Sequence, residues 1–457
     1  MKLPISRRSA IQSISTGFGG LAFAAMAAGQ LKPTNPLAPK KPHFPARAKN
    51  VIFLSMRGAP SHVDTFDYKP QLTADSGKTG QFGGNSRLLG SPWEFSQHGQ
   101  SGLSISSLFP ELSQHADDLC LLRGMHCDQP NHSEATTQTH TGSFQFVRPS
   151  LGAWSLYGLG TENADLPGFI ALNGGGVANF GSAFLPAVYQ GTMLGNAAPA
   201  LRLGAGIAET PKIPNIVNPI MDRNAQLTQL DLVQNLNRSK LKRDIHQPQV
   251  EGMIQSFELA FRMQSTMPDL VDISQDSAAT REMYGVDDAT TSGFGSQCLL
   301  ARRMVESGVR FVELTSGGWD HHDNLKSEME TSCSQIDKPI AALLADLKQR
   351  DLLKDTLVIF AGEFGRTPHG QGGDGRDHNH KGYTTWMAGG GVKGGFSYGA
   401  TDEHGYEAVE GRMHIHDWHA TILHLLGLDH EKLTYNYAGR DFRLTDVHGN
   451  IAKEILA

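Results

Sequence analysis

The residues best suited to chemistry lie between positions 319 and 380. Asp320 and His322 form a first pair, Glu363 follows an apolar stretch that begins at Thr356, and His378 lies in a glycine-rich segment. Carboxylate oxygens and imidazole nitrogens are the ligands that zinc and similar divalent cations take in proteins. Acidic and histidine residues grouped in this way predict a metal centre, and a metal centre indicates hydrolysis.

Each of these residues also has a simpler structural explanation. Asp320 and His322 can both reach one ion from a loop, but Asp320 could instead cap the helix that follows it. Glu363 ends a buried strand, where an unpaired carboxylate is unfavourable, so we expect its partner to be a metal ion or else Arg366. We favour the metal in both cases because the acidic and histidine groups are neighbours in the sequence.

Further candidates surround this set. His378 and His380 are two positions apart, so only one of them is expected to face the ion, and we favour His378. Asp377 is expected to be a ligand or the carboxylate that orients an imidazole. His62 and Asp64 follow the first apolar run and could complete a second ion site, or Asp64 could be a turn residue.

Two more segments carry groups that could react or bind. His132 and Ser133 stand where a helix is expected to begin, and this segment could supply a nucleophile or further ligands. A capping role for Ser133 is the alternative. His414, His416 and Asp417 belong to a histidine-rich patch, for which we favour a structural role over a place in the site.

The elements that must position these residues alternate along the chain. Apolar runs predict buried strands at residues 50–56, 309–314, 356–361 and 384–388. Amphipathic patterns predict helices at residues 296–308, 328–350 and 417–427, with Gly308 ending the first and Asp417 as the N-cap of the last. Residues 68–105 are expected to form an irregular insertion. The alternation predicts an α/β fold, a three-layer sandwich whose central sheet is mostly parallel.

Functional groups gather beyond the carboxyl ends of the strands in such sheets. Asp320, Glu363 and His378 all lie just past a predicted strand or in the loop after one. We therefore expect these residues, remote in sequence, to form one site.

Composition limits the classes of protein to consider. The 457 residues are 39% hydrophobic and 19% charged, which is typical of a folded chain. A formal net charge of −6 lacks the basic character of a nucleic-acid-binding protein, so we expect no nucleic-acid partner. The four cysteines include no CxxC pair, which leaves a thiolate zinc site unsupported. Cys120 and Cys127 are close enough for a disulfide, and buried free thiols are the alternative.

The amino-terminal residues are typical of an export signal. Arg7 and Arg8 form a twin-arginine motif, and an apolar run from Gly17 to Ala28 includes a small-residue cleavage site. We expect a signal peptide at residues 1–28, a proline-rich linker at 29–48 and a single domain with insertions at 49–457. The twin-arginine export machinery is an expected partner. The mature chain is expected to be periplasmic or extracellular, with no transmembrane span.

At these motifs the chain resembles the domain-of-unknown-function family 1501, exported proteins common in planctomycetes. The resemblance covers nearly the whole mature chain and rests on segments that include Gly318–His322, Gly362–Pro368, Gly375–His378 and Ala388–Gly395. More loosely, the chain is similar to the alkaline-phosphatase-like superfamily. That likeness implies an alkaline-phosphatase-like fold with two metal ions above a parallel sheet, and it implies metal ligands at Asp320, His322 and His378.

The sequence also departs from the superfamily pattern. Arg57 follows the first strand, where the superfamily places an Asp, and Glu363-Phe364 stands in place of its Asp-His pair. His132 occupies the position of the nucleophile, which argues against a covalent serine intermediate. The segment that begins at Cys120 lacks the sulfatase signature, so a formylglycine sulfatase is disfavoured.

These patterns together predict an exported metal-dependent hydrolase of phosphate or sulfate esters. One or two divalent ions (zinc, manganese or calcium) would be held by residues from the set His62, Asp64, Asp320, His322, Glu363, Asp377 and His378. Arg57 or Arg366 would bind the anionic group, and Ser133 or an activated water would attack, with His132 beside it. The expected substrate is a small anionic ester or a sulfated or phosphorylated glycan. The alternative is a catalytically reduced, metal-stabilised binding or cell-surface protein on a hydrolase scaffold.

Overall fold

The computed structural model describes residues 35–80, 86–174, 176–195, 218, 220–243, 248–372 and 374–457. The predicted signal peptide and the first part of the predicted linker, residues 29–34, lie outside the described residues. Residues 35–48 lie against the domain, because backbone N–H groups of Lys40 and Arg47 donate to the carbonyl oxygens of Leu159 and Leu425. Leu37 is buried there, so this part of the predicted linker belongs to the packed body.

The described strands are β1 (Asn50–Met56), β2 (Phe95–His98), β3 (Leu103–Ser106), β4 (Leu119–His126), β5 (Phe169–Leu172), β6 (Thr192–Leu194), β7 (Phe311–Ser316), β8 (Thr356–Ala361), β9 (Gly365–Gln371), β10 (Gly375–Asn379), β11 (Tyr383–Gly389), β12 (Phe396–Tyr398), β13 (Ala400–Thr401), β14 (Ala408–Glu410), β15 (Met413–His414), β16 (Tyr435–Tyr437) and β17 (Arg440–Phe442).

The described helices are α3 (His62–Thr65), α4 (Pro70–Ala74), α5 (His132–Thr141), α6 (Leu151–Leu159), α7 (Val177–Phe180), α8 (Arg223–Arg243), α9 (Pro248–Val271), α10 (Ala278–Tyr284), α11 (Ser292–Glu306), α12 (Leu325–Gln349) and α13 (Ile415–Leu425). Short 3-10 helices are η1 (Leu112–Asp118), η2 (Ala187–Tyr189), η3 (Ile273–Gln275) and η4 (Lys453–Ile455).

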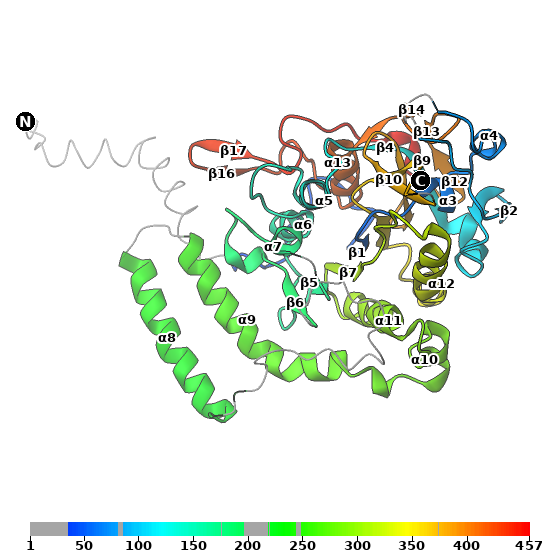
Figure 1. Ribbon diagram of the computed structural model, residues 1–457. Coiled ribbons are helices and arrows are strands. Elements are labelled where there is room, and N and C mark those ends of the chain that lie inside the picture. Colours follow the sequence, from blue (N-terminus) through cyan, green and yellow to red (C-terminus); the bar gives the residue numbers. More distant parts are fainter. Residues whose placement is uncertain are drawn as a thin grey trace, which may run out of the picture.

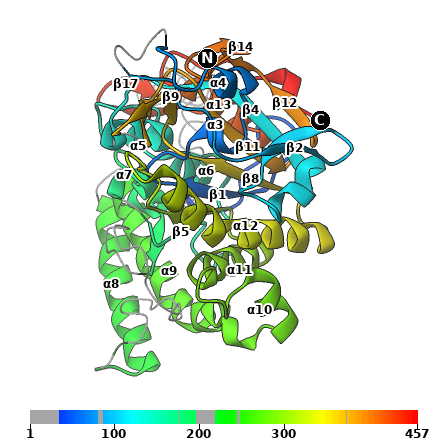
Figure 2. The same cartoon turned by 45° about the vertical axis from the view of Figure 1, so that its right-hand side comes forward.

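The centre of the molecule is a mixed sheet with the strand order β12-β4-β11-β8-β1-β7-β5-β6, in which β15 pairs with β4. β1 lies between β7 and β8 and is parallel to both. Among the described strands of this sheet, only β11 runs against its neighbours, β4 and β8. Helices α11 and α12 lie on one side of the sheet, and α5, α6 and α13 lie on the other (Figures 1 and 2). The predicted α/β sandwich with a mostly parallel sheet is confirmed.

The central strands are apolar because both faces of the sheet are covered. All six residues of β8 are buried, and so are all residues of β1 after Asn50. One carboxylate interrupts this pattern: Glu313 lies in the middle of β7 and is 1% exposed. The loops that leave the carboxyl ends of β1, β7 and β8 carry the predicted site residues.

Most predicted elements are present, with small differences at their ends. The predicted N-cap of the last helix is wrong, because α13 begins at Ile415 and its N-cap is His414. The His414 ring accepts the N–H of His416, and the Asp417 carboxylate accepts the N–H of His414. Asp417 therefore stabilises the first turn from inside the helix. The insertion at residues 68–105 includes the β2–β3 hairpin.

The last features of the fold are a helix pair outside the sheet, the apolar length of the helices and the state of the cysteines. Helices α8 and α9 extend from the body as a pair (Figure 1). Within the described ranges, no helix is long and apolar enough to cross a bilayer. Cys120 and Cys127 are not bridged, and both are buried free thiols, as are Cys298 and Cys333.

Candidate metal centre

Four side chains meet at the carboxyl edge of the sheet: His132, Asp320, His322 and His378. One nitrogen or oxygen from each lies within 4.8 Å of the corresponding atoms of the other three. Asp320 Oδ1 is 3.0 Å from His132 Nε2, 2.9 Å from His322 Nε2 and 3.3 Å from His378 Nε2. The structure thus brings together three of the predicted ligands and adds His132, which we expect from the sequence to be catalytic.

Each residue of this cluster comes from a different part of the fold. His132 is the first residue of α5, Asp320 and His322 follow β7, and His378 belongs to β10. The β9–β10 hairpin, which follows β8, pairs His378 with Arg366 and returns the chain to the carboxyl edge. The four side chains are between 19% and 48% exposed, so the cluster lies near the surface.

The second nitrogen of every imidazole faces an acceptor. His132 Nδ1 is 2.5 Å from Glu363 Oε1, and His378 Nδ1 is 2.6 Å from the carbonyl oxygen of Pro130. His322 Nδ1 faces the side-chain oxygen of Gln371. With an ion bound, these contacts would hold the proton on Nδ1 in all three rings, so that each Nε2 could present a lone pair to the centre of the cluster. Metal-ligating histidines are oriented in the same way by outer acceptors.

The geometry of the Nε2 atoms fits a bound cation. His322 Nε2 and His378 Nε2 are 2.9 Å apart, and two lone pairs at that distance repel unless a proton or a metal ion lies between them. His132 Nε2 is buried without a well-oriented hydrogen-bond partner in the described part of the chain. Four ligands at zinc bond lengths of about 2.0–2.1 Å lie about 3.3 Å apart, close to the distances of 2.9–3.3 Å between Asp320 Oδ1 and the three Nε2 atoms.

Charge at the centre favours cation binding. Burial raises the pKa of Asp320, but hydrogen bonds from His132, His378 and Arg366 outweigh burial and hold that pKa far below its usual range. Burial lowers the pKa of His132, but the carboxylates of Asp320 and Glu363 outweigh burial and raise it to about 9. Without a metal His132 is therefore doubly protonated and positively charged near pH 7. An ion at the centre would replace that positive charge.

Glu363 lies one hydrogen bond away from the cluster. Its Oε1 accepts from His132 Nδ1 and, at 3.0 Å, from the backbone N–H of Gly58. The structure thus places this predicted ligand as the partner that orients His132. The alternative partner, Arg366, pairs instead with Asp320 Oδ1 at 2.6 Å.

The Arg366 guanidinium is buried and faces protein acceptors. The side chain is 1% exposed, and it donates to Asp320 and to carbonyl oxygens that include those of Gly58, Ala59 and Trp319. Its guanidinium therefore holds the first loop and Asp320 in place. Arg57, the other predicted anion-binding residue, is partly exposed, and its guanidinium makes no hydrogen bond or ion pair with the residues that the structure describes.

His62 and Asp64 do not join the cluster. Asp64 is fully buried and forms a two-pronged ion pair with Arg376, at 2.6 Å and 3.0 Å, and it accepts a hydrogen bond from Ser61. His62 is also buried, and its Nε2 is 2.8 Å from the carbonyl oxygen of Gly405. Protein partners thus occupy both predicted ligands of a second ion, and the described residues contain one metal-type cluster.

The remaining candidates lie around the cluster without entering it. Asp377 is exposed, and its carboxylate accepts the N–H of His378. Ser133 is exposed and follows His132 in α5. His380 lies outside the cluster, whereas His378 belongs to it. His321 points away from the cluster, toward Ser332 on α12.

The histidine-rich patch of the last helix has structural roles. His414 and Asp417 form the first turn of α13, and His419 Nε2 is 2.7 Å from the carbonyl oxygen of Thr139. His414 and His416 also line a polar surface cavity of about 600 Å³ beside Asp128. Burial lowers the pKa of His416 to about 4, so this ring is neutral near pH 7.

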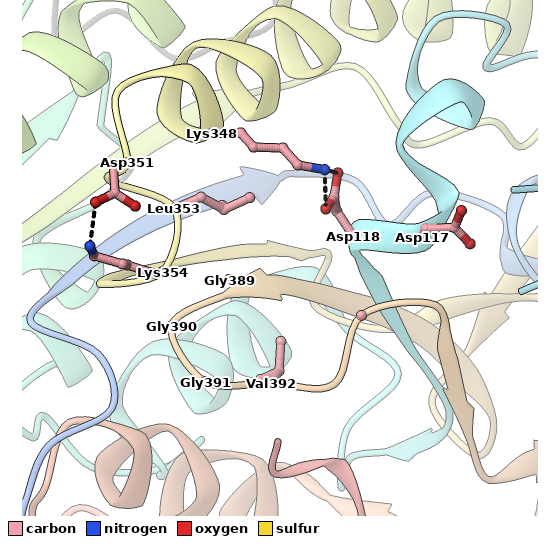
Figure 3. A pocket seen from close by; sticks show the side chains of 11 residues that line it. Asp117, Asp118, Lys348, Asp351, Leu353, Lys354, Gly389, Gly390, Gly391 and Val392 are labelled. Carbon is pink, nitrogen blue, oxygen red and sulfur yellow. Dashed lines mark hydrogen bonds and ion pairs between the residues drawn. The ribbon is translucent and has the colours of Figure 1, made fainter. Parts of the chain in front are cut away.

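Another cavity, of about 460 Å³, lies at the opposite edge of the sheet (Figure 3). Gly389, Gly390 and Gly391 line it where β11 ends, beside the start of β8. All three glycines have positive φ, and a Cβ on Gly389 would lie 2.2 Å from the carbonyl oxygen of Leu353. Tight packing therefore explains this glycine run, which is remote from the metal cluster.

Comparison with known proteins assigns the family. A family model described as "Protein of unknown function (DUF1501)" matches residues 48–456. The chain belongs to this family. The sequence-based resemblance to DUF1501 is thereby confirmed. No curated protein matches the chain.

Solved structures similar to this DUF1501 chain are distant. The PsFucS1 sulfatase from Pseudoalteromonas sp. is 16% identical, with a TM-score of 0.37 over 84% of this chain and 69% of its own. The lipoteichoic acid synthase LtaP from Listeria monocytogenes is 10% identical, with a TM-score of 0.37 over 90% and 78%. A TAB5 alkaline phosphatase mutant is 10% identical, with a TM-score of 0.31 over 75% and 92%. Scores this low carry no argument about function, which rests on the chain's own residues.

Sequence reasoning places His132 in a catalytic role and gives no role to Gln371. His132 resembles the nucleophile position, and Gln371 belongs to no motif. The available signal for His132 was its place at the start of a helix expected near the metal. Gln371 gave no signal, because an amide oxygen that orients an imidazole can come from any loop or strand nearby.

Proposed function

We propose that this DUF1501 protein is an exported, metal-dependent hydrolase of phosphate or sulfate esters. One observation supports this more than any other: three imidazoles and one carboxylate converge, and outer acceptors turn every Nε2 toward the same point. Zinc is the proposed ion, because three imidazoles suit zinc, whereas calcium takes oxygen ligands. The proposal involves one ion, since the described residues provide one cluster.

The chain's own groups have distinct parts in this proposal. A bound divalent ion would supply Lewis-acid chemistry, polarising an ester oxygen and lowering the pKa of a coordinated water. Glu363, Gln371 and Pro130 fix the three rings, and Arg366 holds Asp320. Arg57 remains as a cation with no protein partner among the described residues, and a guanidinium binds phosphate or sulfate through paired N–H donors. We propose that Arg57 binds the anionic group of the ester.

Export belongs to the same proposal. The twin-arginine motif at Arg7 and Arg8 favours transport of a folded protein, and a periplasmic or extracellular location follows from it. The proposed substrates are small anionic esters or sulfated or phosphorylated glycans.

The proposal predicts that protein purified after native export contains about one zinc ion per chain and cleaves a chromogenic phosphate or sulfate ester. His378→Ala should abolish turnover and lower the metal content, because it removes one of four ligands. His380→Ala is the matched control, two positions away and outside the cluster, and should retain both. Elemental analysis and ester hydrolysis measure the two outcomes. Metal-free wild-type protein, or a His378→Ala variant as active as wild type, would contradict the proposal.

A second candidate function has one observation in its favour. Zinc sites with four protein ligands are usually structural, whereas catalytic sites keep a position free for water. On this reading the ion stabilises a binding or cell-surface protein that has lost catalysis. Stable metal binding, without turnover across a broad panel of phosphate and sulfate esters, would favour this function over hydrolysis.

A further inference from the structure

The helix that presents His132 to the centre has almost no apolar face. The buried side chains of α5 are Ala135 and four polar residues, Gln138, Thr139, His140 and Thr141. A helix of ten residues is marginal by itself, so tertiary contacts must hold it. Because the buried side chains of α5 are mostly polar, most of its tertiary contacts must be hydrogen bonds and ion pairs. Such contacts are directional, so they fix where the helix lies.

The strongest of these contacts is a buried ion pair with the central sheet. His140 Nε2 is 3.0 Å from Glu313 Oε1, and the two side chains are 5% and 1% exposed. His140 Nδ1 is 2.8 Å from the carbonyl oxygen of Thr136. Both ring nitrogens thus face oxygen atoms, an arrangement that suits a doubly protonated His140 beside an ionised Glu313. The pair lies on the sheet face of Phe53, whose ring is 5.3 Å from the His140 ring.

Two further contacts fix the same end of α5. Gln138 exchanges hydrogen bonds with Asp128, in the segment after β4, through the backbone N–H and the side chain of Asp128. His419 on α13 contacts the carbonyl oxygen of Thr139. The contact with Glu313 differs from these two because β7 leads directly to Asp320 and His322. One strand therefore carries two ligands of the centre and anchors the helix that carries a third.

We propose that the His140–Glu313 ion pair sets the position of α5 along the sheet and thereby places His132 Nε2 in the metal centre. The inference rests on the metal centre of the proposed function. Neither residue belongs to the cluster, so both are positioning residues. Buried ion pairs contribute little net stability compared with apolar side chains of similar size, and their best-attested role is to specify one register. Glu313 is the only charged residue of β1, β7 and β8, which is consistent with that role.

The test replaces both charges together, because a single replacement would leave an unpaired buried charge. In the double variant Glu313→Leu/His140→Leu, the thermal midpoint of the metal-free protein should stay the same or rise. Its zinc affinity, measured by competition with a chromophoric chelator, should fall about tenfold or more, as when other groups that orient metal ligands are removed. Amide hydrogen exchange in α5 of the metal-free variant should be faster than in wild type.

The matched control removes a buried pair remote from the centre. Arg302 on α11 and Asp346 on α12 are 2.9 Å apart and both 4% exposed. They belong to a wider network, because Arg302 also pairs with Asp276 and Glu306, and Asp346 with Arg350 and Tyr284. Arg302→Met/Asp346→Leu should leave zinc affinity and α5 exchange unchanged. Unchanged zinc affinity in the Glu313→Leu/His140→Leu variant would overturn the positioning role. If wild-type protein binds no zinc, the proposed function fails, and α5 exchange alone then decides: unchanged exchange overturns the inference and faster exchange supports it.

Discussion

At the scale of single residues, Glu363 is a predicted ligand that instead orients His132, one of the four residues of the cluster. Its buried carboxylate accepts from His132 Nδ1 and from the N–H of Gly58. The first contact fixes the tautomer of His132, and the second attaches the loop after β1. A carboxylate behind an imidazole also raises the basicity of the ligating nitrogen.

Glu363→Gln should therefore weaken zinc binding by about 10- to 100-fold while the fold is retained. The amide keeps the shape of the side chain but removes the charge that supports His132. Chelator competition measures the affinity. Asp377→Asn is the control at an exposed predicted ligand, and it should change the affinity less than about twofold, since its carboxylate accepts only the N–H of His378. If Asp377→Asn weakened zinc binding as much as Glu363→Gln is expected to, Asp377 would be a ligand after all.

The residues of the centre differ in how far the sequence could predict them. Asp320, His322 and His378 stand out because carboxylate and imidazole groups follow strands whose carboxyl ends meet. The roles of Glu363 and Arg366 depend on which neighbour lies within 3 Å, and no periodicity encodes that. Asp64 fits an ion ligand equally well in the sequence, until Arg376 is seen to lie against it.

At the scale of elements, Asp337 joins α12 to η1. Its two carboxylate oxygens accept the backbone N–H groups of Glu111 and Leu112, at 2.9 Å and 2.8 Å, where η1 begins. Burial raises the pKa of Asp337 to about 6, although these two hydrogen bonds favour the charged form. The unfolded chain loses the same proton near pH 4.

Between about pH 4 and pH 6 the native state thus binds more protons than the unfolded state at this residue. Its contribution to stability is present below about pH 4 and is lost as the pH rises through about 6. Asp337→Asn should flatten the fall in the free energy of unfolding across this window, measured by denaturant titration at several pH values. Asp231→Asn, at an exposed position on α8, should leave the wild-type slope intact. If the free energy of unfolding of Asp337→Asn fell with pH as steeply as that of wild type, other groups would cause the pH dependence.

The elements themselves follow from hydrophobic patterning with few exceptions. Apolar runs predict β1 and β8 to the residue, because a parallel sheet covered on both faces needs them. The antiparallel direction of β11 has no such signal, since its apolar residues fit either direction. The N-cap of α13 was misassigned because His414 is a less common cap than an Asp three residues later.

At the scale of the whole molecule, an ion at the centre would join three parts of the chain that the sheet only brings near. Binding to the native state alone adds about 4 kcal/mol when the free ion is at a thousand times its dissociation constant. Removal of the ion by a chelator should therefore lower the thermal midpoint of wild-type protein by several degrees. The midpoint of His378→Ala should not respond to the chelator. If the thermal midpoint of wild-type protein also did not change with the chelator, no ion would be bound.

The ligands come from α5, from the turn after β7 and from β10, so their order along the chain has a consequence for maturation. A partly synthesised or unfolded chain offers at most Asp320 and His322 as near neighbours, which is too few donors to retain zinc. Under the proposed function, metal capture would then be a late event, after the hairpin carrying His378 has closed over the sheet edge. A zinc ion bound at the cluster would then show that the chain is fully folded, and a chain that stopped folding earlier would bind no zinc.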